Sequence, residues 1–244
     1  MIDTLNEGWT TKKNILVILA HPDDPDFFCG AMIARWREQG HQVSYCLLTK
    51  GQRGTQDPQM DPEVTSAIRM REQTEAAAVL GVSQIHWMDY MDGELVADLE
   101  LRNSIIKLIR KMKPQIVVSC DPTNLFPAPD RINHPDHRAA GQAVVDAVFP
   151  AAGNPGYMIM EKNVSLPAHQ VEEVWLSLTH QPDFNVNLDE YLDRKINAIL
   201  CHRSQISLSP EEMFARYSSH MEVDPLTGEK AFFEKFKRIR LTVK

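Results

Sequence analysis

The most constraining feature of the chain is an uncharged apolar run, residues 14–20, that ends abruptly in His21, Asp23 and Asp24. The run is rich in Ile, Leu and Val without polar alternation, which is typical of a strand buried on both faces of a parallel sheet. In open α/β sheets the ligand crevice lies outside the carboxyl ends of the strands. The sequence therefore predicts a functional site here, where an imidazole and a carboxylate can converge on a cation.

A second cluster of the same composition, His134-Pro135-Asp136-His137, comes soon after another short apolar run, residues 115–120. If both runs are parallel strands of one sheet, the two clusters meet at the same edge. Two His and one Asp around Zn²⁺ leave a coordination position for water, as in catalytic zinc sites. For either cluster alone, a turn or an N-cap is the alternative. Two such clusters, each after a buried type of strand, favour the metal site.

The order of the remaining segments predicts the fold. A strand, a helix and a strand within residues 14–48 form a βαβ unit, which is parallel and right-handed by a strong rule. Further strands are expected at 84–88, 115–120 and 171–178, and helices at 26–39, 62–80, 98–111, 138–148, 188–200 and 211–218. We predict an α/β fold: a Rossmann-like, doubly wound, mostly parallel sheet of five to six strands flanked by helices. Residues 1–244 are expected to form a single domain.

Several segments between these elements carry separate predictions. Loops 121–133 and 150–168 contain prolines and are expected to be walls of the active site. Arg53 lies in a glycine-containing loop without a phosphate-binding fingerprint, where its guanidinium could hold substrate oxygens or simply be solvated. Charges on the helix at 62–80, Arg69 among them, are interpreted as ordinary helical ion pairs. The basic and aromatic segment 232–240 is interpreted as an amphipathic covering element.

Composition excludes some classes of partner. A net charge of −7 argues against a nucleic-acid backbone or an anionic membrane as the main partner. Residues 1–13 are polar and no apolar run has membrane length, so we predict a cytoplasmic location and no membrane span. The four cysteines are far apart and are interpreted as reduced core residues. Oligomeric state is open, a homo-oligomer included.

Taken together, the motifs resemble the PIG-L/LmbE family of zinc-dependent N-deacetylases. The resemblance covers most of the chain and is carried, in order, by residues 20–24, 52–55, 71–72, 80–82, 134–137, 202–205 and 231–236. It implies a hydrolase that removes the acetyl group from an N-acetylated amino sugar or a conjugate containing GlcNAc. A His₂Asp ligand set tolerates Fe²⁺ as well as Zn²⁺, so iron in the cell is open.

The resemblance also implies a role for each site residue. The implied zinc ligands are His21, Asp24 and His137. Asp23 is implied to be the general base, His134 the oxyanion stabiliser or acid, and Asp136 the residue that orients His134. Arg53, Asp92 and His202 are implied to contact substrate. Some relatives have a tyrosine two positions before the first histidine of the second cluster. Here that position is Ile132, which argues against a tyrosine-assisted mechanism.

Other classes of function remain open at this point. One is an amidase that cleaves a sugar–thiol conjugate or another small amide. A second is a non-catalytic Rossmann-like module that binds sugars or nucleotides without metal, and a third is a structural metal protein with a closed site. Substrate assays, elemental analysis and an exchangeable fourth ligand would separate these from a deacetylase.

Overall fold

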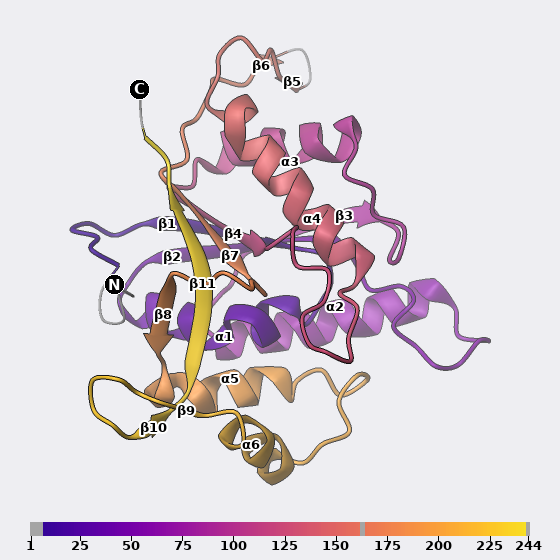
Figure 1. Cartoon of the computed structure of the whole chain (residues 1–244). Coiled ribbons are helices and arrows are strands. Elements are labelled where there is room, and N and C mark those ends of the chain that lie inside the picture. The colour runs from indigo at the N-terminus through magenta and orange to yellow at the C-terminus, as the bar shows by residue number, and fades with distance from the viewer. Residues whose placement is uncertain (1–6, 162–163, 243–244) are drawn as a thin grey trace.

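The computed structural model describes residues 7–161 and 164–242 (Figure 1). Within these ranges the main sheet has seven strands in the order β3-β2-β1-β4-β7-β11-β8. Its first five strands run parallel: β1 (Asn14–Leu19), β2 (Gln42–Thr49), β3 (Ile85–Tyr90), β4 (Ile116–Cys120) and β7 (Glu173–Ser177). The predicted α/β class and mostly parallel sheet are confirmed, with every expected strand present.

Two more strands complete one edge of the sheet and correct the expected number of five to six. Strand β11 (Phe233–Arg240) lies between β7 and β8 (Phe184–Asn187), and it is antiparallel to both. The sequence predicts no strand at β8, and it gives the β11 segment only as a covering element. Strand β11 instead belongs to the sheet itself, and its buried Phe236 packs into the core.

Helices cover both faces of the sheet because the buried strands are apolar on both sides (Figure 1). On β1, Ile15 and Val17 pack with one layer of helices, while Leu16 and Ile18 pack with the other. The first layer is α1 (Asp24–Glu38), α2 (Pro62–Val79), α5 (Leu192–Ile199) and α6 (Pro210–Ser218). The second layer is α3 (Leu99–Met112), α4 (Pro135–Asp146) and the π-helical turn η1 (Ala147–Ala152).

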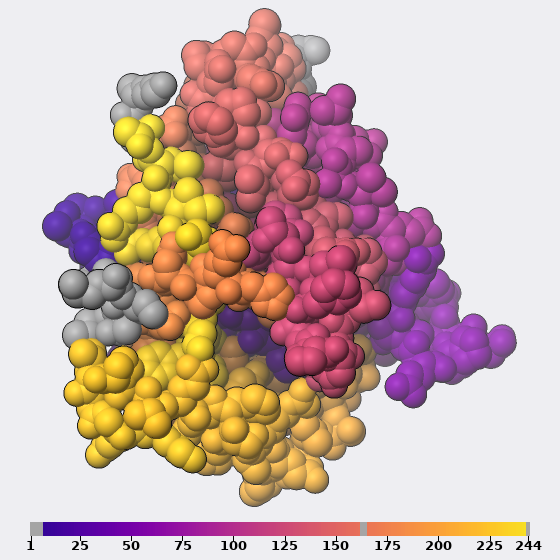
Figure 2. Space-filling model, in the orientation of Figure 1, coloured from indigo at the N-terminus to yellow at the C-terminus, as the bar shows by residue number. Residues whose placement is uncertain are grey.

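Short elements connect this framework. A 3₁₀ turn, η2 (Asp189–Tyr191), precedes α5, and two small hairpins pair β5 (Met160–Glu161) with β6 (Val164–Ser165) and β9 (Glu222–Val223) with β10 (Lys230–Ala231). In Figure 2 the C-terminal part of the chain, coloured gold to yellow, covers the lower part of the visible face. No helix within the described ranges has both the length and the apolarity needed to cross a bilayer.

The segment 150–168 lies elsewhere than predicted. The guanidinium of Arg110 on α3 donates hydrogen bonds to the carbonyl oxygens of Ala151, Ala152 and Asn154. Directly after the segment, the His169 ring bonds the carbonyl of Pro114, which lies just before β4. The described part of this segment therefore contacts α3 and approaches the amino end of β4, whereas a site wall would lie at the carboxyl ends of the strands.

Candidate metal centre

Three predicted ligands converge where β1 and β4 end. His21 follows β1, Asp24 is the first residue of α1, and His137 lies in the first turn of α4. Nδ1 of His21 lies 3.3 Å from Nε2 of His137, which in turn lies 3.0 Å from Oδ1 of Asp24. Nδ1 of His21 is 3.4 Å from Oδ2 of Asp24. The structure thus brings together two clusters more than a hundred residues apart in the sequence.

These three side chains have the chemistry and spacing of a zinc ligand set. Ligands bound at about 2.0–2.1 Å in a tetrahedron lie about 3.3 Å from one another. Nδ1 of His137 pairs with the Oδ1 acceptor of Asn133 at 3.1 Å, so Nε2 of His137 presents a lone pair to the site. Nε2 of His21 faces the carboxylates of Asp92 and Asp136, so it carries the proton of the neutral ring. Nδ1 of His21 therefore also presents a lone pair to the site. Two imidazole nitrogens and a carboxylate oxygen aimed at one point are suited to hold a metal ion between them.

A second group of possible ligands, His21, His134 and Asp136, is less suited to a metal. Asp136 is fully buried, and its two oxygens accept hydrogen bonds from the N–H groups of Gly93 at 2.7 Å and Leu95 at 3.2 Å. Oδ2 of Asp136 also lies 3.2 Å from Nε2 of His21. The carboxylate of Asp136 therefore orients His21, whereas the resemblance implies that it orients His134.

His134 caps helix α4 and faces the cavity. Its Nδ1 accepts a hydrogen bond from the backbone N–H of Asp136 at 3.2 Å. This bond leaves the proton of the neutral ring on Nε2. Burial, together with the imidazoles of His21 and His137, lowers the pKa of His134 below its ordinary value of 6.5. The ring is therefore a neutral hydrogen-bond donor near pH 7, and its centroid lies 4.7 Å from that of His21.

Asp23 has an unusual backbone conformation, with φ at 89°. Positive φ is uncommon for residues other than glycine, and such strain often occurs at active sites. The conformation is held because Asp23 N–H donates to Oε1 of Gln73 at 2.7 Å, while Arg69 contacts Oδ2 of Asp23 at 3.2 Å. Burial raises the pKa of Asp23 from 3.8 to about 6, although the charge of Arg69 opposes this shift. Asp23 therefore combines a fixed position with a pKa near neutrality.

Arg69 belongs to this site, and its interpretation as part of an ordinary helical ion pair is wrong, because it pairs with Asp23 and Asp92 outside its own helix. The side chain is only 5% exposed, and it donates to the carbonyl oxygens of Pro22 at 2.7 Å and Gly51 at 3.3 Å. It thereby joins the turns after β1 and β2. The available signal was the helical spacing of polar residues that face the core from α2: Thr65, Ser66, Arg69, Glu72 and Gln73.

The three implied substrate contacts differ in position. Asp92 lies in the cavity, with Oδ1 at 3.2 Å from Nε2 of His21 and Oδ2 accepting from Arg53 N–H at 3.1 Å. Arg53 lines the cavity with a half-exposed side chain that pairs with Glu94. His202 is fully buried and bonds Oδ2 of Asp26 at 2.9 Å, so it does not reach the cavity. His202 therefore supports α1 through Asp26, and the implied contact between His202 and substrate is wrong.

The cavity over this centre has a volume of about 440 Å³. The predicted metal ligands, Asp23, His134, Arg53, Arg69 and Asp92 line it, together with Phe27, Gly54 and Gly93. Loop 121–133 contributes the Asn133 side chain behind His137, and no described residue of 150–168 lines the cavity.

Comparison with known proteins agrees with this geometry. A family model described as PIG-L, GlcNAc-PI de-N-acetylase, matches residues 16–148, which include both polar clusters. A diacetylchitobiose deacetylase of Thermococcus kodakarensis is 32% identical over 217 residues, covering 89% of this chain and 78% of that protein. A probable N-acetyl-alpha-D-glucosaminyl L-malate deacetylase 2 of Bacillus anthracis is 26% identical, covering 84% of this chain and 87% of that protein.

A solved structure shares the whole architecture. It is the N,N'-diacetylchitobiose deacetylase from Pyrococcus horikoshii, complexed with an inhibitor, and it matches with a TM-score of 0.80 at 28% identity. The match covers 93% of this chain and 84% of that one. The order of the motifs, the fold and these similarities agree, and the chain therefore belongs to the PIG-L family.

Proposed function

We propose that this protein is a zinc-dependent hydrolase that removes the acetyl group from an N-acetylated amino sugar or a GlcNAc-containing conjugate. The observation that carries the proposal is the convergence of His21, Asp24 and His137 beside the carboxylate of Asp23. Further support comes from relatives that are named as deacetylases of substrates containing N-acetylglucosamine.

The ligand set suits zinc and leaves one coordination position for water. A zinc ion held by these residues would lower the pKa of that water to about 7 and polarise the amide carbonyl. Asn133, Asp92 and Asp136 hold the two imidazoles in place through their outer nitrogens. Such partners fix the tautomer and the orientation of metal-binding histidines.

In this proposal Asp23 is the general base. It takes a proton from the attacking water, and its pKa of about 6 suits a base that works near neutral pH. The water oxygen bonds to the carbonyl carbon, and the C–N bond then breaks. Asp23 returns its proton to the departing nitrogen, so the products are acetate and a primary amine. Arg69 keeps the carboxylate in position throughout.

His134 stabilises the oxyanion that forms on the carbonyl oxygen. Its ring faces the cavity, and the capping bond at Nδ1 directs the Nε2–H group as donor. The loss of one such donor typically costs on the order of 3 kcal/mol of transition-state stabilisation. A neutral ring is sufficient for this role, since His134 donates a hydrogen bond to the oxyanion and transfers no proton to it.

The decisive experiment is Asp23→Asn. We expect this variant to keep its zinc, measured by elemental analysis, and to lose about 10²–10⁴-fold in turnover. Turnover is scored as acetate and primary amine released from a panel of N-acetylated sugars and conjugates. Asp193→Asn, an exposed carboxylate on α5, is the matched control and should behave as wild type. Full activity of Asp23→Asn at full zinc content would refute the assignment.

A further inference from the structure

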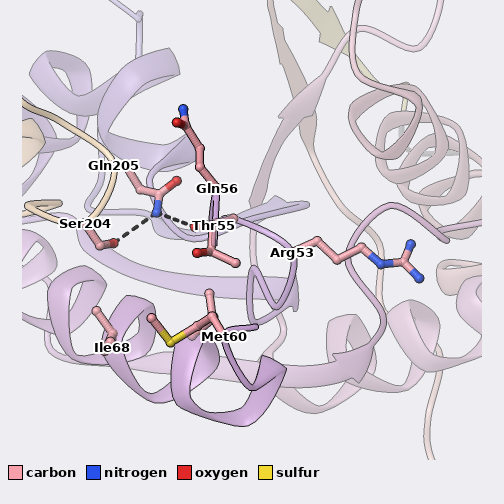
Figure 3. Close-up of a pocket in the computed structure, with 9 residues that line it drawn as sticks. Arg53, Thr55, Gln56, Met60, Ile68, Ser204 and Gln205 are labelled. Carbon is pink, nitrogen blue, oxygen red and sulfur yellow. Dashed lines mark hydrogen bonds between the residues drawn. The ribbon is translucent and has the colours of Figure 1, made fainter. Parts of the chain in front are cut away.

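The turn directly after α5 is fixed to α2 and to the loop after β2. Glu72 on α2 accepts hydrogen bonds from the N–H of Ser204 at 2.8 Å and from its hydroxyl at 2.7 Å. The Gln205 side chain donates to the carbonyl of Gly54 at 2.8 Å and to the Ser204 hydroxyl at 3.0 Å (Figure 3). These bonds hold the turn, and they thereby hold His202, which lies in it.

His202 begins a chain of hydrogen bonds that ends at the backbone of Asp23. Its Nε2–H group donates to Oδ2 of Asp26 at 2.9 Å, since a carboxylate can only accept. The side-chain amide of Gln73 donates to the same oxygen at 2.9 Å through its Nε2. Oε1 of Gln73 then accepts from the backbone N–H of Asp23 at 2.7 Å. Because His202, Asp26 and Gln73 are fully buried, water does not compete for these bonds.

This chain of hydrogen bonds determines the orientation of the Gln73 amide. The backbone N–H of Asp23 can only donate, and the Asp26 carboxylate can only accept. One orientation of the amide satisfies both neighbours, with Nε2 toward Asp26 and Oε1 toward Asp23. Loss of the bond from His202 frees the Asp26 carboxylate to rotate, and the Gln73 amide then loses the acceptor that sets its orientation.

The orientation of the Gln73 amide matters because Asp23 has a φ of 89°. A residue other than glycine keeps such a conformation only where its surroundings hold it. The bond to Gln73 holds the backbone of Asp23, whereas Arg69, one turn earlier on α2, holds its side chain. The two contacts therefore act on different parts of the proposed base.

The pair formed by His202 and Asp26 costs the fold stability. Within the described ranges, Oδ1 of Asp26 and Nδ1 of His202 are buried without a hydrogen-bond partner. Buried polar atoms are normally paired, and an unpaired one lowers stability. A buried pair of charged groups adds little to stability even when its geometry is good. A role in holding the site therefore accounts for this pair better than a role in stabilising the fold.

We propose that His202 is a positioning residue for the reaction. Through Asp26 and Gln73, it holds the backbone of Asp23 in the conformation that presents the carboxylate to the attacking water. The inference rests on the proposed deacetylase function, in which Asp23 is the base. None of His202, Asp26 and Gln73 lines the cavity, so they act on the rate through Asp23 and leave substrate binding unchanged.

The kinetic test compares His202→Ala and Gln73→Met with His169→Ala, at verified zinc content and with turnover scored as released acetate. His169 is the matched control because its ring also bonds another element, the Pro114 carbonyl, but near the amino end of β4. We expect kcat to fall about 10–100-fold in His202→Ala and in Gln73→Met, with KM unchanged, because the base is misplaced. His169→Ala should keep the wild-type kcat. The double variant should be no slower than the slower single variant, because both residues act through one chain.

Hydrogen exchange gives a second readout, which does not depend on activity. The N–H of Asp23 loses its fixed acceptor in either variant, and its exchange is followed by NMR in isotope-labelled protein. We expect this exchange to quicken at least about tenfold relative to that of the Val118 N–H in the central strand β4. A general loss of stability would quicken exchange at Val118 as well.

Three results would overturn the inference: wild-type kcat in the folded, zinc-loaded variants, a double variant whose loss is the product of the two single losses, or unchanged exchange at Asp23. If one of the two variants does not fold, the other still decides the result. If exchange at Asp23 quickens but the wild-type protein releases no acetate, the deacetylase proposal fails and the positioning of Asp23 by His202 stands. If acetate is released and neither kcat nor exchange responds, the positioning fails and the deacetylase proposal stands.

Discussion

The carboxylate of Glu234 lies 2.6 Å from the ammonium group of Lys195, and both side chains are buried. Glu234 also accepts hydrogen bonds from the N–H groups of Ala31 and Met32, just after Cys29 interrupts the helical geometry of α1. Lys195 in turn donates to the carbonyl of Phe27 at 2.6 Å. Strand β11 and helix α5 therefore support the first turns of α1, which begin with the predicted ligand Asp24.

Lys195→Met leaves the Glu234 carboxylate buried without its cation. Breaking a buried pair in this way typically costs about 3–5 kcal/mol, and we expect a loss of that size in the free energy of unfolding, measured with urea. Lys235→Met, next to Glu234 on β11, is the control, because Lys235 pairs with Glu222 at a partly exposed position. That variant should lose less than about 1 kcal/mol. Equal losses in the two variants would contradict the structural role given to Lys195.

Glu173 provides a test of stability against pH. Its carboxylate accepts hydrogen bonds from Trp9 at 3.1 Å, and from Trp175 and Arg238 at 2.8 Å each. Burial raises the pKa of Glu173, but the bonds from Arg238, Trp175 and Trp9 together hold it below the ordinary value of 4.5. The stabilisation is therefore present above pH 4.5 and is lost as the pH falls through the lowered pKa.

We expect Glu173→Gln to flatten the fall in unfolding free energy below about pH 5, measured by urea unfolding at a series of pH values. Glu172→Gln is the neighbouring control, because its carboxylate pairs with Lys13 and is 44% exposed. At neutral pH this control should lose less than about 1 kcal/mol. Parallel acid profiles for Glu173→Gln and the wild type would show that these hydrogen bonds do not favour the charged carboxylate.

Asn133 supports the metal ligand His137 from outside the cavity, through the contact between Oδ1 and Nδ1 at 3.1 Å. The loss of such a partner typically weakens metal binding by about 10–100-fold, and we expect this for Asn133→Ala. Zinc affinity is measured by competition with a chromophoric chelator. Ile132→Ala changes the preceding residue, which is 76% exposed, and should keep the affinity of the wild type. Unchanged affinity in both variants would remove Asn133 from the support of the site.

The fold was largely predictable because its main signals are local. Strand β1 and helix α2 begin at the predicted residues, where an apolar run starts and where Pro62 follows the capping residue Asp61. Strand β8 was not predictable in this way. It is four residues long, and it is defined by pairing with β11 almost fifty residues later, a contact that no local pattern contains.

Less of the site than of the fold could be predicted from the sequence. The two His/Asp clusters indicate the candidate ligands in the sequence, but the contacts of the side chains around them depend on how the helices and strands pack. The carboxylate of Asp136 contacts His21 and accepts hydrogen bonds from backbone N–H groups, not from His134. His202 is buried and bonds Asp26. The alternative interpretation of a capping turn also holds in part, because His134 caps α4 while it faces the cavity.

Arg69 is the strongest case of a residue whose importance depends on packing, and it gives the last prediction. Arg69→Gln removes the guanidinium that joins the carbonyls of Pro22 and Gly51 to the carboxylate of Asp23. A misplacement of a catalytic group by about 1 Å can cost on the order of 10²-fold in rate, and we expect kcat to fall by that order. Zinc content should remain that of the wild type, since Arg69 contacts none of the three ligand side chains.

Two further variants separate this role from charge and from helix stability. Arg69→Lys should not restore kcat, because a single ammonium group cannot reproduce the fork of donors that contacts three acceptors. Arg71→Gln makes the same change two residues later on α2, at an exposed position, and should keep the wild-type kcat. Steady-state kinetics at verified zinc content compare all three variants. A lysine that restores full turnover would mean that Arg69 contributes only charge, and the positioning of Asp23 would then need another cause.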